Sequence, residues 1–132
     1  MKYLLDTNTC IYIINKLSSK IQKKFKNLKI GDIGISAITY AELQFGVSNS
    51  SKPEQNQEAL TEFLGPLEIL DFPADACPLY GEVRKQLKDS GNIIGPMDLL
   101  IGTHALFLKS ILITNNVNEF SRIKGLKIEN WT

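Results

Sequence analysis

Short apolar runs alternate with longer segments of helical periodicity along the whole chain. The runs are typical of buried strands and lie at 2–6, 33–35, 67–72, 111–114 and 126–131. Between them, apolar residues recur every three or four positions, which predicts helices at 8–16, 37–47, 53–64, 73–90, 94–110 and 118–123, with helical spacing also over 16–29. Strands that alternate with helices predict an α/β fold, with a mainly parallel central sheet flanked by helices on both faces.

Residues that suit helix ends mark several boundaries: Asn8 and Ser36 as N-caps, Pro53 and Pro96 in first turns, and Gly65 and Gly91 beyond last turns. The chain shows no internal repeat and no linker composition. Its 132 residues are close to the usual size of one domain and suffice to bury an apolar core. We therefore predict a single domain over residues 1–132.

The composition is that of an ordinary globular protein, with 43% hydrophobic residues, 22% charged residues and a net charge of +1. No apolar stretch approaches the roughly 18 residues of a membrane span, so a cytoplasmic protein is expected. Cys10 and Cys77 have neither CxxC spacing nor clustered histidines, which argues against a zinc site or a redox pair. Both are expected to be buried free thiols.

Polar residues follow two of the predicted strands at the point where each strand ends. Asp6 follows the first strand, and the fourth strand leads into Thr114, Asn115 and Asn116, with Glu119 about one helical turn later. In parallel α/β sheets, ligands bind beyond the carboxyl ends of the strands. We therefore expect these side chains at one edge of the sheet, with Asp6 exposed there.

Two further acids interrupt hydrophobic runs in predicted helices. Glu42 lies in a segment that is expected to be largely buried, where a charged residue needs a partner. Asp98 lies near a helix start, where unsatisfied N–H groups also favour an acid for purely structural reasons. Gly102, one turn later on the same face, removes bulk beside Asp98 and favours a pocket there. His104, the only histidine, lies round the helix from Asp98 and is expected to have a packing or surface role.

These observations give a candidate site of four acids: Asp6, Glu42, Asp98 and Glu119. At close range their mutual repulsion would raise their pKa values unless a cation lay among them. The chain offers zinc no His or Cys cluster, whereas oxygen donors suit Mg²⁺, with Mn²⁺ as an alternative. Asn8 and Thr114 are expected to orient the acidic ligands through hydrogen bonds. A carboxylate-held Mg²⁺ can activate water and bind the oxygens of a phosphodiester.

The segment from Lys16 to Lys29 carries six lysines and no acid, although the whole chain is almost neutral. Ile21, Phe25 and Leu28 recur within it at helical spacing, so one face is apolar and the lysines occupy the rest. The ordinary interpretation is a solvated helix face. The sharper one is a patch that contacts RNA phosphates, for which the candidates are Lys20, Lys23 and Lys24.

Four segments, in this order, resemble the acidic motifs of the PIN-domain ribonucleases: LLDTN at 4–8, ISAITYAEL at 35–43, GPMDLLIGTHAL at 95–106 and LITNNVNEF at 112–120. With GLKIENW at 125–131 the chain is similar, over essentially its whole length, to the VapC toxins of bacterial toxin–antitoxin pairs. Any one motif is weak, but the four together at these spacings are specific.

The resemblance implies a PIN-like domain with the activity of a metal-dependent endoribonuclease, which cleaves RNA to inhibit translation. It implies a VapB-type antitoxin as inhibitor and a homodimer that pairs again with antitoxin, with an apolar face at 8–16 or on the helix from Pro53. Members with the TNN…EF pattern cut initiator tRNA in its anticodon stem-loop, which makes initiator tRNA the expected substrate.

Motif by motif, the family's acids match Asp6, Glu42, Asp98 and Glu119. The resemblance gives Asp6 and Asp98 as the main metal ligands, and the two glutamates as residues that position the attacking water. Polar support falls to Thr114 and to the neighbouring asparagines, Asn116 among them. Many PIN domains carry an aspartate directly after the strand, where this chain has asparagines, so the fourth acidic position stays open between Glu119 and those neighbours.

Two other functions remain as alternatives. The segment DTNT after a strand also resembles the haloacid-dehalogenase-like phosphatases, in which the first acid is a nucleophile. Their usual second acid, two residues on, is Asn8 here, which argues against them. The other alternative is a binding module without catalysis, in which the acidic pocket captures a basic segment of a partner.

Overall fold

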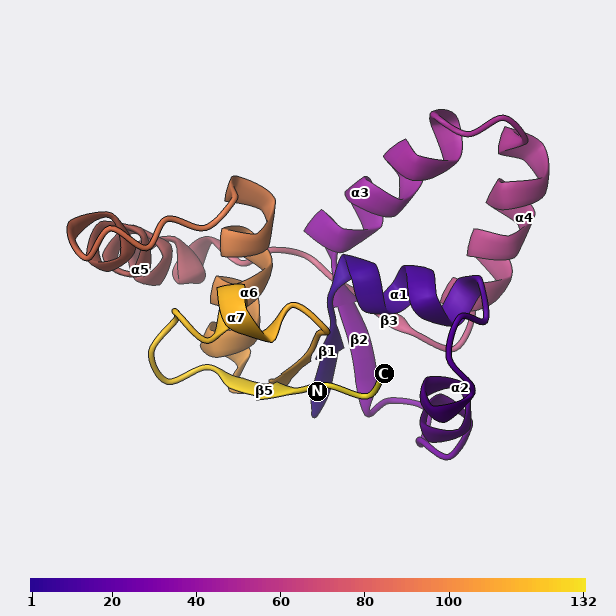
Figure 1. Cartoon of the computed structure of the whole chain (residues 1–132), viewed down its shortest axis with the longest axis horizontal. Helices are drawn as coiled ribbons and strands as arrows, with labels where there is room; N and C mark the ends of the chain where they lie inside the picture. Colours follow the sequence, from indigo (N-terminus) through magenta and orange to yellow (C-terminus); the bar gives the residue numbers. More distant parts are fainter.

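The computed structural model describes residues 1–132, and its centre is a five-stranded sheet in which all neighbouring strands are parallel (Figure 1). The strand order is β3-β2-β1-β4-β5, so β1 lies in the middle. The strands are short: β1 (Tyr3–Leu5), β2 (Ile33–Ser36), β3 (Glu68–Leu70), β4 (Ile111–Ile113) and β5 (Lys127–Glu129). The predicted α/β fold with a mainly parallel sheet is confirmed.

Helices cover both faces of the sheet (Figure 1). Four precede β3 in the chain: α1 (Thr7–Ile14), α2 (Ser19–Lys26), α3 (Ala37–Ser48) and α4 (Pro53–Leu64). A 3-10 turn, η1 (Ala74–Ala76), and three helices follow it: α5 (Cys77–Asp89), α6 (Pro96–Leu108) and α7 (Val117–Phe120). No helix has the length and apolar character that a membrane crossing requires.

The two faces of β1 face two separate hydrophobic cores. Successive side chains of a strand point to opposite faces, and both Leu4 and Leu5 are fully buried. Leu4 packs in a core with residues of α5 and α6, whereas Leu5 packs in a core with residues of α1, α2, α3 and α4. Burial on both faces explains why the inner strands have apolar runs rather than alternation.

The helix boundaries agree with most of the expected end residues. α4 begins at Pro53, α6 begins at Pro96, and Gly91 follows α5 with a φ of +73°. The lysine-rich helix α2 is shorter than 16–29, because Ser18 caps it by accepting the N–H of Ile21. α5 begins at residue 77 rather than 73, because the chain from Pro73 first forms the turn η1.

The two cysteines differ in environment. Cys10 is a fully buried free thiol on α1, as expected, and burial followed by the nearby Asp6 charge raises its pKa well above the usual value. Cys77 is also free, but it is exposed at the first position of α5, so the prediction of a buried thiol is wrong there. A cysteine at a helix start can face solvent even when its sequence neighbours are apolar.

Candidate active site

The candidate site lies at the carboxyl ends of β1 and β4. The chain proceeds from β1 outward to β3 and then returns to place β4 on the other side of β1, so the strand order reverses between them. Ligand sites in open α/β sheets lie at such a reversal. Asp6 directly follows β1 and Thr114 directly follows β4, while Asp98 lies in the first turn of α6. Residues from distant parts of the sequence therefore meet at one edge.

Asp6 is held by hydrogen bonds to both of its carboxylate oxygens. It caps α1, where Oδ1 accepts the backbone N–H of Thr9 at 2.8 Å, and Oδ2 accepts the hydroxyl of Thr114. The N-cap is therefore Asp6 rather than the predicted Asn8, because α1 begins two residues earlier than a cap at Asn8 would allow. Only 2% of Asp6 is exposed, so the expected exposure at the sheet edge is also wrong. Burial raises the pKa of the Asp6 carboxyl, although the hydrogen bonds from Thr114 and Thr9 oppose this shift.

Two threonines of α1 extend this network, and sequence reasoning missed both. The Thr7 hydroxyl donates to Glu42 Oε1 at 2.6 Å, which ties α1 to α3 beside the site. The Thr9 hydroxyl donates to the carbonyl of Ile113 at 3.0 Å, which ties α1 to β4. The only signal in the sequence is their position, directly after a strand-ending acid. Glu42 is partly exposed rather than largely buried, because α3 turns its Phe45 side, 68% exposed, toward solvent.

Asp98 and Glu119 form the second acidic pair. Burial raises the pKa of Asp98 to about 7, followed in effect by a hydrogen bond with Glu119 and by the negative charges of Glu119, Glu42 and Asp6. The other three predicted acids therefore all act on Asp98, and Glu42 also acts on Asp6. Such repulsion is the expected property of carboxylates that share a site without a cation.

Asn116 connects Glu119 to Thr114, as the predicted supporting role requires. Its backbone N–H donates to Thr114 Oγ1 at 2.9 Å, and its side-chain amide donates to Glu119 Oε2 at 2.9 Å. A continuous set of hydrogen bonds thus runs from Glu119 through Asn116 and Thr114 to Asp6. This set fixes the positions of two carboxylates relative to each other.

Gly102 allows α7 to approach α6 closely. A Cβ atom at this position would lie 2.5 Å from Ile123 Cδ1 and 3.3 Å from Phe120 Cδ1. Phe120 is the residue after Glu119, so this packing helps to position Glu119 relative to Asp98. The expected close approach of another element to Gly102 is confirmed, but the side chains of Phe120 and Ile123, rather than a pocket, occupy the room that the glycine leaves.

The donor set suits a hard cation. Mg²⁺ prefers oxygen ligands and is usually held by one or two carboxylates together with water. No three His, Cys, Asp or Glu side chains are arranged to enclose a metal ion by themselves. Asp6 and Asp98 meet the smaller requirement, because each oxygen of Asp6 keeps a free lone pair after its hydrogen bond and Asp98 has an unfavourable negative environment.

Other predicted residues lie away from the acids. Asn8 is exposed on α1 and takes no part in the hydrogen bonds of the site. The lysines of α2 lie near the starts of β1 and β2, at the opposite edge of the sheet from the acids (Figure 1). His104 is buried on α6, where Nδ1 lies 2.9 Å from Ser36 Oγ and the ring meets Phe72 edge-on. Its predicted packing role is confirmed.

The family of the chain is shown by comparison with known proteins. The PIN domain family matches residues 3–126. The chain belongs to the PIN-domain family. The PIN-domain relatives include "Ribonuclease VapC2" of Rickettsia felis, 50% identical over 132 residues, which cover 99% of this chain and 98% of the relative. Another is "tRNA(fMet)-specific endonuclease VapC" of Salmonella typhimurium, 39% identical over 131 residues, 99% of this chain and 98% of the relative.

Among solved structures, the fold matches a chain of VapBC2 from Rickettsia felis, determined bound to a DNA fragment from their promoter. The match has a TM-score of 0.92 and 48% identity, and it covers 100% of both chains. The relatives place this PIN domain among the VapC ribonucleases, as its motifs predicted. The phosphatase alternative is set aside for two reasons. The chain matches the PIN domain family and not a phosphatase family, and it has Asn8 where these phosphatases have their second acid.

Proposed function

We propose that this VapC-type ribonuclease is a metal-dependent toxin that cleaves initiator tRNA in the anticodon stem-loop and thereby inhibits translation. The observation that supports the catalytic part is that Asp6, Glu42 and Glu119 all lie near enough to Asp98, at the strand-order reversal, to raise its pKa. The substrate follows from similarity to relatives named as tRNA(fMet)-specific endonucleases.

Asp6 and Asp98 would hold a Mg²⁺ ion, or Mn²⁺ in its place, together with water. When bound there, such an ion would activate a water and offset charge on the phosphodiester. Thr114 and the N–H of Thr9 keep the Asp6 carboxylate in one orientation. This orientation is set before any ligand binds, which removes the entropy cost of ordering the side chain at the moment of reaction.

Glu42 and Glu119 position the attacking water. Thr7 fixes Glu42 and Asn116 fixes Glu119. The Glu42 oxygen that Thr7 does not contact accepts a hydrogen bond from the water that attacks the phosphorus, and Glu119 positions this water from the side of Asp98. The P–O bond to the leaving sugar oxygen then breaks, and the proton of the water passes to a carboxylate. The fourth acidic position is assigned to Glu119, with Asn116 in support.

A VapB-type antitoxin and a second copy of the chain complete the proposed assembly. The support is that similar structures were solved as VapBC pairs, as in Rickettsia felis and Salmonella typhimurium. The lysines of α2 contact the RNA backbone at a distance from the cut, because they face solvent at the other edge of the sheet. Neutralising Lys20, Lys23 and Lys24 together is expected to lower the slope of binding against salt concentration, by about 0.7 for each lost contact with a single strand. An unchanged slope would mean that these lysines form an ordinary solvated helix face and do not contact RNA.

The deciding experiment incubates the purified chain with end-labelled total tRNA, with Mg²⁺ or with EDTA, and maps the cuts. The test variant is Asp98→Ala, and the control is Asp75→Ala, which removes an exposed acid that is not one of the four acids of the site. We expect one discrete product from initiator tRNA that forms only with Mg²⁺ and only when Asp98 is present. The Asp75→Ala control should give the same product as the parent. Metal-dependent cleavage that survives in Asp98→Ala would refute the site. Cuts in another RNA would refute the substrate alone, and binding of an antitoxin peptide without any cleavage would favour the binding module.

A further inference from the structure

A hollow of about 470 Å³ lies between the second half of α5 and the start of α6. Its volume is in the range of sites that bind small ligands. We call it the α5–α6 groove, and its principal lining residues are Tyr80, Arg84, Lys88, Ile93, Pro96 and Leu99. None of these side chains is among the proposed catalytic residues, and only Pro96 and Leu99 lie within a family motif, the segment 95–106.

The groove combines an apolar floor with two cations. Five of its eight lining residues are hydrophobic and none is acidic. The Arg84 guanidinium donates to the Tyr80 hydroxyl at 3.2 Å, which keeps the cation close to an aromatic ring. Neither Arg84 nor Lys88 is in an ion pair, since the structure's one salt bridge joins Lys85 to Asp89. Both cations are therefore available to an anionic ligand.

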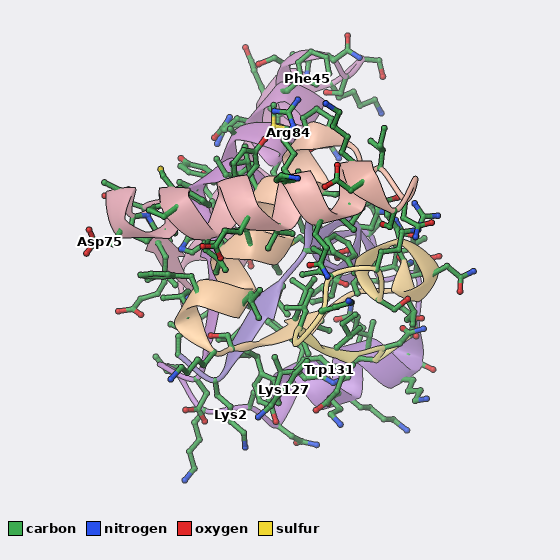
Figure 2. All side chains as sticks on the ribbon, turned by 90° about the vertical axis from the view of Figure 1, so that its left-hand side faces the viewer. Lys2, Phe45, Asp75, Arg84, Lys127 and Trp131 are labelled. Carbon is green, nitrogen blue, oxygen red and sulfur yellow. The ribbon has the colours of Figure 1, made fainter.

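The groove adjoins the acidic site. Pro96 and Leu99 line the groove from the same turn of α6 that carries Asp98. The loop before α6 is held from the turn that follows α7, because Arg122 donates to the carbonyl of Ile93 at 3.0 Å. Figure 2, which looks onto α5, shows Arg84 on the upper side of this helix, the end of the molecule at which α6 begins. A polyanion that reaches the acids from this side meets Arg84 and Lys88 first.

We propose that the α5–α6 groove binds one unstacked nucleotide of single-stranded RNA, next to the phosphate that is cut. The inference rests on the proposed function. The base lies on the apolar floor against Tyr80, since aromatic side chains bind unpaired bases by stacking. Arg84 and Lys88 contact the flanking phosphates. Ile93, 72% exposed at the mouth of the groove, extends the apolar surface toward the base.

This assignment supplies what the acidic centre lacks. Four carboxylates repel an RNA strand, and the α2 lysines are too far away to offset the repulsion locally. Cations with no acidic neighbour in the groove lower that cost beside the cut. The groove also favours unpaired RNA, because a base inside a duplex is stacked and cannot enter. A loop substrate is thus preferred over a helical one.

The test measures binding of a fluorescent 12-nucleotide single-stranded RNA to the full chain in EDTA, so that no cleavage occurs. The double variant Arg84→Ala/Lys88→Ala is expected to lower the salt slope by about 1.4, which is two phosphate contacts at about 0.7 each. Tyr80→Leu keeps apolar bulk without the ring and is expected to weaken binding about tenfold. Lys85→Ala, which removes a cation from another side of α5, is the control and should change neither quantity.

Each outcome decides the proposal. The proposal is supported if the groove variants bind the single-stranded RNA more weakly while Lys85→Ala binds it as the parent does. Binding of a duplex of the same length should be the same in the parent and in the groove variants. Unchanged binding overturns it, and so does a change in sedimentation of the Arg84→Ala/Lys88→Ala variant, which would make the groove an interface between copies. The Mg²⁺-dependent cleavage of tRNA is followed in parallel. If the groove binds RNA but the chain never cuts RNA, the proposed function is refuted and the role of the groove stands. If the groove variants cleave tRNA as well as the parent does, the role of the groove is refuted and the proposed function stands.

Discussion

Gly102 offers a test that links the packing of α7 to the chemistry of the acids. In Gly102→Ala, the new Cβ would lie 2.5 Å from Ile123 Cδ1, a distance that real Cβ atoms essentially never show. Ile123 is 2% exposed and Phe120 is fully buried, so the end of the Ile123 side chain must either rotate within the packed core or push α7 and the turn after it outward. We expect α7 to shift, and Glu119 to move away from Asp98 with it.

The magnitude follows from two opposing contributions. Replacing glycine by alanine inside a helix favours folding by roughly 0.5–1 kcal/mol. Overpacking a buried contact costs about 1–3 kcal/mol. Gly81→Ala on α5 isolates the first contribution, because nothing lies within 4 Å of a Cβ there. The free energy of unfolding of Gly102→Ala is therefore expected to fall about 1–3 kcal/mol below that of Gly81→Ala, since the difference is the overpacking alone.

Denaturant unfolding gives this difference, and NMR titration of the Asp98 carboxyl gives its effect on the site. The pKa of Asp98 is expected to move down from about 7 as Glu119 recedes, and tRNA cleavage is expected to fall. In Gly81→Ala both should match the parent. Equal stabilisation of the two variants with an unchanged Asp98 pKa would refute the reasoning, because it would mean that α7 does not depend on the missing side chain.

Three further tests address individual side chains. At pH values above 7, Asp98→Asn is expected to have a higher thermal unfolding midpoint than the parent, and near pH 4 the two should agree. The pKa of Asp98 is about 7 in the folded chain and 3.8 in the unfolded chain, so the parent loses stability as the pH rises between these values. Thr114→Val removes the hydroxyl that lowers the pKa of Asp6, so the acid limb of the cleavage profile should move to higher pH; an unmoved limb would exclude Asp6 as the titrating group. A thiol reagent should modify Cys77 and spare Cys10 until the chain unfolds, which counting modified thiols before and after denaturation checks.

The sequence was sufficient to predict that the acids lie near one another, because their positions in the fold follow from general rules. Asp6 and Thr114 end strands that are parallel, so they had to meet at one edge of the sheet. Asp98 interrupts an apolar helix, and Gly102 lies one turn from it. These are local patterns whose spatial consequence does not depend on the details of packing.

Other features depended on contacts that no local pattern contains. Asp6 can be buried because a threonine more than a hundred positions away donates a hydrogen bond to its carboxylate. Thr7 and Thr9 have the same side chain but reach α3 and β4 respectively, which spacing alone does not reveal. Arg84 and Lys88 lie one turn apart, as on any solvated helix face, and only the arrangement of α5 against α6 makes a groove beside them.

Asp6 caps α1 in addition to its proposed metal-binding role, so substitutions at Asp6 and at Asp98 are expected to have different effects on folding. A change at Asp6 removes the cap of α1, which costs about 1 kcal/mol, and leaves the Thr9 N–H and the Thr114 hydroxyl without their acceptor. A change at Asp98 relieves repulsion instead. One substitution at Asp98, on α6, is therefore expected to give an inactive chain that still folds. A substitution at Asp6, at the end of β1, is expected to remove activity and stability together, so a stable inactive variant should arise more readily at Asp98.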